Sequence, residues 1–386
     1  MQGRGAAIVV ICLLAPITAA GPIARAAPPF RAVEPGRVLR FPADHAAHPS
    51  YRTEWWYYTG HLWVADDSTD SPGAAPGPVQ PADFGFQLTF FRSGVARPET
   101  PRASAWALRD IYFAHLALGD FGARRFHAAE RMMRDALGLA GADTAAYRVW
   151  IDDWSAALAA DGSHRLRAAE GASHAIDLTL VPVKPPALHG DAGYSRKGEA
   201  PGQASYYYSL TRLAAAGTVQ SGGRTLAVRG DAWMDHEFTT GELAADLVGW
   251  DWFGLQLDDG SEIMLYLLRR EDGTPGPASS GSLIAPDGSV TPLARSAFTV
   301  VADATWRSAA SGAVYPARWR VRVPGEALEL TLEPRLTDQE LVTRESTGIT
   351  YWEGAVSARG TRGGAPLAGR GFVELTGYAT KFRARM

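Results

Sequence analysis

The feature that most constrains the fold is a run of aromatic residues, Glu-Trp-Trp-Tyr-Tyr, that begins at Glu54. Adjacent aromatic residues favour a β-strand. Side chains alternate between the two faces of a strand, so Glu54, Trp56 and Tyr58 share one face. Trp55 and Tyr57 share the other face. A strand that covers a core on one side only is usually polar outside. Large rings on both faces therefore predict that one face packs a core and that the other lines a cavity or a second domain.

The rest of the chain also has the pattern of an all-β protein. Asp-Gly pairs, typical of hairpin turns, separate short segments in which apolar and polar residues alternate, such as 84–90 and 328–332. These segments predict antiparallel strands. Residues 126–139 have a helix-forming composition instead, and we expect them to form a helix or turn that covers the end of a barrel. The sequence therefore predicts antiparallel β-structure with few helices.

The length of 386 residues is enough for two domains. The Pro- and Gly-rich stretch 184–205 lies near the middle and is the best boundary. Directly after it, Ser205-Tyr206-Tyr207-Tyr208-Ser209 weakly repeats the first aromatic run, which is consistent with two related β units. We therefore predict an N-terminal unit at 27–203 and a C-terminal unit at 204–386.

Residues 1–26 resemble an export signal, with a positive charge at Arg4, an apolar stretch and a small-residue cleavage site at Ala24-Arg25-Ala26. Thr18-Ala19-Ala20 is a weaker alternative site, and an uncleaved signal anchor is the alternative to cleavage. Cleavage would remove Cys12, the sole cysteine. We predict a periplasmic or secreted protein that does not span the membrane when mature.

Several function classes lack support in the sequence. The net charge of −3 does not indicate a nucleic-acid partner. The motifs of P-loop nucleotide binding, of nucleophile-elbow hydrolases and of H-E-x-x-H metalloproteases do not occur in the sequence. His45 and His48, or His236 with its acidic neighbours, offer metal-ligand types. Neighbouring strand residues point to opposite faces, however, so no metal site is predicted.

The polar cluster most suited to chemistry is Trp-Met-Asp-His-Glu-Phe at 233–238. On a strand, His236 would share a face with Met234 and Phe238, where it could exchange a proton near neutral pH. The alternative is a buried histidine that bonds to a backbone carbonyl. Carboxylates also stand beside aromatic rings elsewhere in the chain, a combination that suits a flat apolar ligand and stabilises a carbocation. The alternative there is that these acids bond to indole N–H groups or arginines within the core.

The chain resembles the AttH / carotenoid 1,2-hydratase family of lipocalin-like proteins over about residues 45–378. The matching motifs are the aromatic run at 54–60, the loop at 190–198 with the tyrosines after it, and the segments 233–237, 250–253 and 351–354. This resemblance implies two successive lipocalin-like (calycin-type) antiparallel β-barrels. It also implies export, and an association with ABC-exporter components, beside which bacterial members are often encoded.

The resemblance further implies a reaction. The carotenoid hydratases add water to a terminal isoprenoid double bond by acid-assisted protonation, without a cofactor. Their histidine matches His236, but the tryptophan that follows their Asp-His motif is Phe238 here. They also use a tyrosine, for which Tyr266 is the candidate, and an aspartate that the strand at 263–268 lacks.

We therefore predict a protein that binds a hydrophobic isoprenoid-like or lipid ligand where the barrels meet. The first hypothesis is a cofactor-independent hydratase or a related lyase or hydrolase. The second is a non-catalytic carrier or chaperone that works with an exporter. The catalytic candidates are His236, Asp235, Glu237 and Tyr266. The ligand-binding candidates are Glu54, Trp56, Tyr58, Tyr207, Phe238, Trp252 and Trp352.

Overall fold

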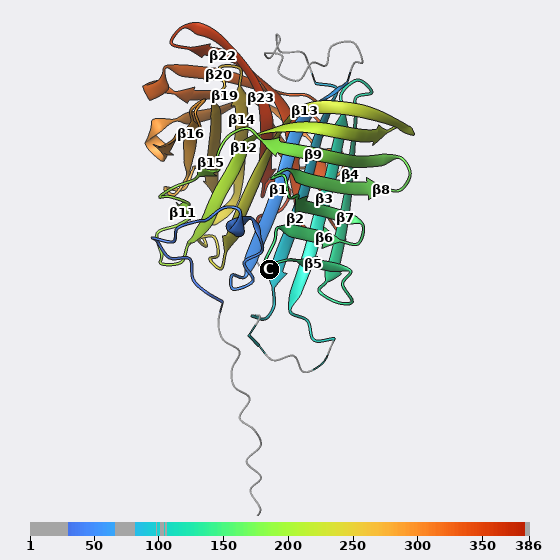
Figure 1. Ribbon diagram of the computed structural model, residues 1–386. Coiled ribbons are helices and arrows are strands. Elements are labelled where there is room, and N and C mark those ends of the chain that lie inside the picture. Colours follow the sequence, from blue (N-terminus) through green and yellow to red (C-terminus); the bar gives the residue numbers. More distant parts are fainter. Residues whose placement is uncertain (1–29, 66–81, 98, 101–103, 105, 383–386) are drawn as a thin grey trace, which may run out of the picture.

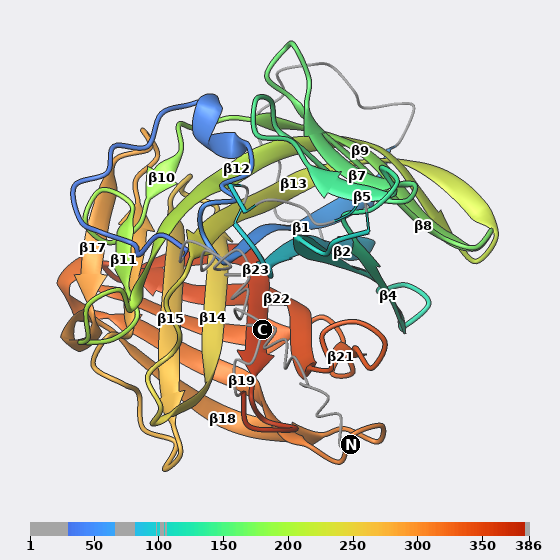
Figure 2. The same cartoon turned by 90° about the horizontal axis from the view of Figure 1, so that it is seen from below.

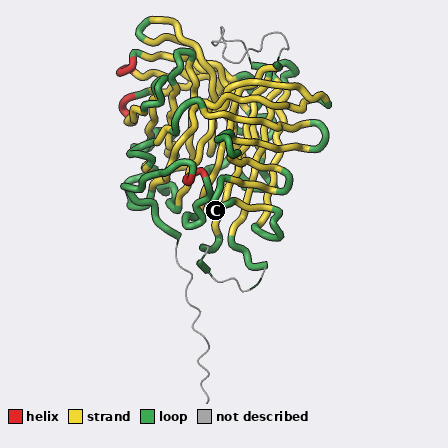
Figure 3. The backbone as a smooth tube through the Cα atoms, in the orientation of Figure 1, coloured by secondary structure: helices red, strands yellow, loops and turns green. Residues whose placement is uncertain are grey.

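The computed structural model describes residues 30–65, 82–97, 99–100, 104 and 106–382. Within these ranges the chain is almost entirely β-structure, and the helices are three short 3-10 turns, η1 (Ala43–His45), η2 (Arg295–Ala297) and η3 (Pro324–Glu326) (Figure 3). In the described residues, no helix is both long and apolar enough to cross a membrane. The predicted cleavage sites and Cys12 lie outside the described residues.

The strands form two antiparallel sheets (Figure 1). The first contains β1 (Thr53–Val64), β2 (Phe84–Gly94), β3 (Asp110–Asp120), β4 (Arg125–Arg134), β5 (Ala140–Ala142), β6 (Arg148–Ile151), β7 (Trp154–Leu158), β8 (His164–Glu170), β9 (His174–Pro182), β10 (Ala187–Leu188), β11 (Tyr194–Arg196), β12 (Ala204–Ser221) and β13 (Arg224–Thr239). The second contains β14 (Leu247–Leu257), β15 (Glu262–Arg270), β16 (Ser280–Ile284), β17 (Val290–Ala294), β18 (Thr299–Arg307), β19 (Val314–Val323), β20 (Leu328–Pro334), β21 (Glu340–Val342), β22 (Thr350–Arg362) and β23 (Ala365–Thr376).

The first sheet runs in the order β4-β3-β2-β1-β13-β12-β9-β8-β7-β6-β5 and curls into a nearly closed barrel (Figure 2). The second sheet, in the order β17-β16-β15-β14-β23-β22-β20-β19-β18, forms a half-barrel. The prediction of an all-β, lipocalin-like fold is therefore confirmed. The change of sheet, however, falls between β13 and β14. The boundary predicted at 203/204 does not coincide with it, because β12 and β13 pair with strands of the first sheet.

The expected helix at 126–139 is wrong. Most of this segment forms β4, an edge strand that pairs along its whole length with β3. A helix there would leave the backbone N–H and C=O groups along the outer side of β3 without ladder partners. Pairing with β3 therefore outweighs the helix-forming composition.

The two faces of β1 and β13 contact different parts of the protein. Trp56 pairs with His236 and Tyr58 pairs with Met234, and these side chains belong to the core enclosed by the first sheet, apart from the polar His236. The opposite face carries Tyr57, which packs with residues of the second sheet in a separate cluster. The strands β1, β2 and β12 contact β23, β22 and β14 respectively. The prediction that one face packs a core and the other meets a second unit is confirmed.

Candidate functional site

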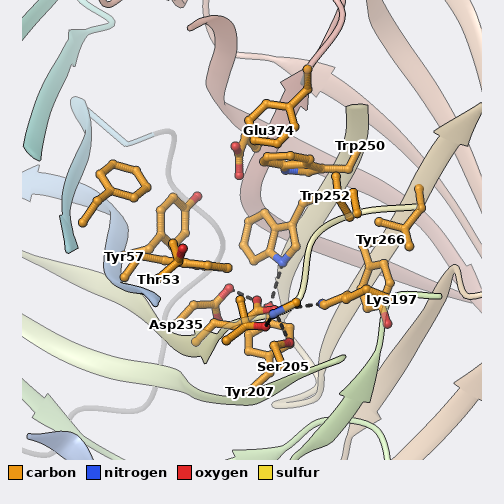
Figure 4. A pocket seen from close by; sticks show the side chains of 18 of the residues that line it. Thr53, Tyr57, Lys197, Ser205, Tyr207, Asp235, Trp250, Trp252, Tyr266 and Glu374 are labelled. Carbon is orange, nitrogen blue, oxygen red and sulfur yellow. Dashed lines mark hydrogen bonds and ion pairs between the residues drawn. The ribbon is translucent and has the colours of Figure 1, made fainter. Parts of the chain in front are cut away.

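A pocket with a volume of about 220 Å³ lies between the two sheets. Most of the side chains that line it come from the odd-numbered face of β1, β2 and β13, and from β12, β14, β15, β22 and β23, and the others come from loops (Figure 4). Its walls are largely aromatic, contributed by Trp55, Tyr57, Phe91, Tyr207, Trp250, Trp252, Tyr266, Tyr351 and Phe382. Such walls suit a flat, apolar ligand and can stabilise a positive charge by cation–π attraction.

Asp235 contributes a buried carboxyl group to the pocket wall. Its oxygens accept hydrogen bonds from the Tyr207 hydroxyl at 2.7 Å, from the Trp233 indole N–H at 2.6 Å and from the Ser209 hydroxyl. Burial raises the pKa of Asp235 to about 7, although these three donors favour the charged form. A carboxyl group with this pKa can accept or release a proton at neutral pH.

Glu237, two residues along the same face of β13, has a charged partner. Its Oε1 lies 3.1 Å from the Nζ of Lys197 and also accepts a hydrogen bond from Ser205. The ammonium group lies over two rings, 4.1 Å from the centroid of Tyr266 and 4.9 Å from that of Tyr207. Burial alone would lower the pKa of Lys197, but Glu237 and the nearby tyrosine and aspartate outweigh burial and raise it. Lys197 therefore keeps its charge inside the pocket.

Two more carboxyl groups, Glu353 and Glu374, come from the neighbouring strands β22 and β23. The Tyr57 hydroxyl donates to Oε1 of Glu353 at 2.7 Å. Burial, together with the charge of Glu374, raises the pKa of Glu353 well above its usual value. Burial also raises the pKa of Glu374 to about 7. Beside its aromatic rings the pocket thus holds Glu353, which favours its protonated form, and Asp235 and Glu374, which can exchange a proton near neutral pH.

The structure divides the predicted site residues into two groups. Asp235, Glu237 and Tyr266, the catalytic candidates other than His236, line the pocket, as do Tyr207 and Trp252. The remaining candidates are buried and do not line it. Glu54, Trp56, Tyr58, His236 and Phe238 lie inside the first sheet, and Trp352 lies in the core of the second. His236, which we predicted in the ligand cavity, does not line this pocket, because it lies on the opposite face of β13.

Sequence reasoning missed Lys197, Gln87, Glu353 and Glu374. A signal for Glu353 was present. It is adjacent to Trp352, so one of the two had to face away from the core of the second sheet. Lys197 lies in a Gly-rich loop, where no periodicity indicates the direction of a side chain.

The buried group around His236 is an ionic network. His236 Nε2 and His48 Nδ1 each lie 2.9 Å from Oε1 of Glu54, and Arg92 Nε lies 3.2 Å from Oε2. Burial alone would lower the pKa of His48, but hydrogen bonds to Asp44 and Glu54 outweigh burial and raise it.

The same three residues, His48, Glu54 and His236, place metal-ligand atoms within 4.8 Å of one another. The charges nearby are already matched without an ion. Two arginines, Arg37 and Arg92, and His48, whose pKa is raised, contact three carboxyl groups, Asp44, Glu54 and Asp110. A divalent cation would also have to lie close to the Arg92 guanidinium, so the group fits an ion-pair network better than a metal centre.

Comparisons with known proteins agree with this architecture. The family model described as AttH-like matches residues 32–378. A solved structure from Nitrosomonas europaea, described as an AttH protein, is 36% identical with a TM-score of 0.77, and the match covers 90% of this chain and 99% of that one. Kievitone hydratase from Nectria haematococca is 16% identical with a TM-score of 0.64, over 89% of this chain and 94% of that one, which shows a shared fold. No curated protein matches the chain.

Proposed function

The chain belongs to the AttH-like family, and from this premise we propose that it is a hydratase or a related lyase that needs no cofactor. Its substrate would be a hydrophobic, isoprenoid-like or lipid molecule with a carbon–carbon double bond, bound in the pocket between the sheets. The observation that carries the proposal is a set of buried carboxyl groups within aromatic walls, among which Glu353 has a pKa raised well above its usual value. Protonating an alkene requires an acid that keeps its proton at neutral pH, and the resulting carbocation requires rings to stabilise it.

The residues have distinct roles in this proposal. Glu353 donates its proton to one alkene carbon, and the electron pair of the double bond forms the new C–H bond. The adjacent carbon becomes a carbocation, which faces rings such as Trp252. Water then adds to the cation, and Asp235 accepts the proton that the water loses. Proton exchange with solvent returns Glu353 and Asp235 to their starting states, so the net change is the addition of one water molecule.

The proposal predicts carbon-bound deuterium in the product. The protein would be incubated in deuterium oxide with a panel of linear isoprenoids and prenylated phenols. We expect at least one to gain the mass of one D₂O, with one deuterium that does not wash out in ordinary water. Because Asp235 must be ionised, the rate should rise as the pH increases through about 7.

Asp235→Asn is the matched variant for this experiment and should lose about 10²–10⁴-fold in turnover. Deuterium gain at equal rates in the variant and in the wild type would refute the role of Asp235. No turnover of any panel member, together with tight binding of several, would favour the alternative function.

The alternative is a non-catalytic carrier of a hydrophobic ligand. It is favoured by the hydrogen bonding of the acids on β13, since Asp235 has three donors and Glu237 is paired with Lys197. Acids that are fully bonded within the wall are less available for proton transfer. An ABC-exporter component as the partner of such a carrier stays a prediction.

We also propose that the protein is exported, from the signal-like residues 1–26. N-terminal sequencing of protein recovered from the periplasm or the medium should begin after Ala26. A recovered chain that still contains Cys12 would contradict cleavage at both of the sites considered.

A further inference from the structure

One polar atom near the pocket has no partner. Gln87, on β2, is only 1% exposed and lines the pocket. In the sheet register, Gln87 pairs with Thr59 of β1, and Thr89, two residues along the same face of β2, pairs with Tyr57. Thr89 and Tyr57 line the pocket, so Gln87 belongs to the pocket face. Its amide Nε2 donates to Thr89 Oγ1 at 2.5 Å, whereas its Oε1 has no hydrogen-bond partner. A buried, unpaired acceptor is costly, and such a group calls for an explanation.

The orientation of this amide is fixed by a chain of hydrogen bonds that ends outside the pocket. Glu130 accepts from the backbone N–H of Ser346 and from the Ser346 hydroxyl. Ser346 has then used its only hydrogen, so its oxygen accepts from Nε2–H of His115 at 2.9 Å. Burial lowers the pKa of His115 to about 3, so the ring is neutral and its Nδ1 carries a lone pair.

The chain continues from His115 to the pocket. Nδ1 of His115 accepts from the Tyr351 hydroxyl at 2.8 Å. The Tyr351 hydroxyl has then used its only hydrogen, so toward the neighbouring side chain of Gln87 its oxygen can act only as an acceptor, which favours the NH₂ group of Gln87 on that side. Rotating the amide by half a turn would turn Oε1 toward the Tyr351 oxygen, which has no hydrogen left to donate. The atom without a partner is therefore the carbonyl oxygen, a pure acceptor.

We propose that Gln87 recognises an O–H group of the ligand, which makes the ligand of this pocket a hydrophobic alcohol or phenol. The proposal rests on the proposed function in that it assigns a further feature to the same ligand. The hydroxyl group would lie at the end of the pocket formed by β2 and β22, where Gln87 lies beside Thr89 and Tyr351. It would donate to Oε1 of Gln87 and so satisfy the unpaired acceptor.

The test compares two probes with one carbon skeleton, geraniol and geranyl methyl ether, by equilibrium binding to the full chain. The ether lacks the hydroxyl hydrogen and leaves Oε1 of Gln87 unpaired. We expect wild-type protein to bind geraniol roughly tenfold more tightly than the ether. Gln87→Leu should bind the two equally. Thr89→Val is the matched control, because it removes the acceptor of one Nε2–H of Gln87 but keeps the hydrogen bonds among Ser346, His115 and Tyr351, and it should keep the preference.

Other outcomes overturn the proposal. If wild type binds both probes equally, the unpaired oxygen holds a water molecule and not the ligand. If Gln87→Leu slows turnover but leaves the probe preference intact, Gln87 positions the attacking water. If Gln87→Leu loses cooperative melting, the preference for geraniol is measured on Tyr351→Phe in its place. It frees the amide to rotate and should reduce the preference, and an unchanged preference would overturn the assignment. Because binding is measured without turnover, the result stands or fails separately from the hydratase proposal.

Discussion

Glu353→Gln is expected to lower turnover by about 10²–10⁴-fold and at the same time to make the protein more stable at neutral and alkaline pH. The loss of turnover follows because glutamine cannot donate the proton that starts hydration. The gain in stability follows because burial raises the pKa of Glu353 well above 4.5, its ordinary value. As the pH rises above 4.5, the unfolded chain releases this proton while the folded protein retains it, so the free energy of unfolding falls. Each unit by which the folded-state pKa of Glu353 exceeds 4.5 lowers the free energy of unfolding by about 1.4 kcal/mol once the pH has risen above that folded-state pKa.

Thermal melting of wild type and Glu353→Gln over a range of pH measures this effect. The variant should have the higher melting temperature above about pH 5, and the difference should disappear below about pH 4.5, where both states of the wild type hold the proton. The Tyr57 hydroxyl can still donate to the amide oxygen, so the hydrogen bond at 2.7 Å is retained in the variant. A variant that melts lower than wild type at every pH would show that Glu353 is structural, and the acid would then have to be sought at Glu374.

The sequence was sufficient to predict the β-fold and the two-sided character of β1, because alternation is a property of the strand itself. It was not sufficient to choose between the two faces. Glu54, Trp56 and Tyr58 were expected at the ligand, whereas Trp55 and Tyr57 line the pocket. A residue pattern indicates which side chains share a face, but which face meets the second sheet depends on how the first sheet curls.

The same ambiguity between the two faces of a strand affected the prediction for His236. It lies between Asp235 and Glu237, so predicting all three as one catalytic group placed residues from both faces of β13 in one site. The structure keeps the two acids in the pocket and buries the histidine inside the first sheet. The boundary at 203/204 missed the change of sheet for a related reason. The Pro- and Gly-rich stretch is a long connection within the first sheet, and composition does not distinguish such a connection from a linker.

Glu54→Gln is expected to have the opposite effect on stability, a loss of about 3–5 kcal/mol, since it removes one partner of a fully buried ionic network. Glu54 accepts from His48, His236 and Arg92. A neutral amide in its place removes one of the two carboxylates that His48 and Arg92 each contact, so that only Asp44 and Asp110 remain to compensate them. His236→Phe should also destabilise the protein, because it leaves a carboxylate oxygen of Glu54 with one donor fewer.

The pH dependence should also be the reverse of that of Glu353→Gln. Burial alone would raise the pKa of Glu54, but the hydrogen bonds from His236 and His48 and the charge of Arg92 lower it well below 4.5. A depressed pKa contributes stability above about pH 4.5 that is lost as the pH falls through the folded-state pKa, so the deficit of Glu54→Gln should be full at neutral pH and shrink in acid. Melting curves of both variants over one pH series test this. Two buried glutamates, replaced by the same amide, should shift the melting temperature in opposite directions at neutral pH. The reason is that the protein holds one as an acid facing the pocket and the other as an anion that accepts from Arg92 and two histidines. Equal shifts for the two variants would mean that burial alone, and not the partners of each carboxyl group, sets their contributions.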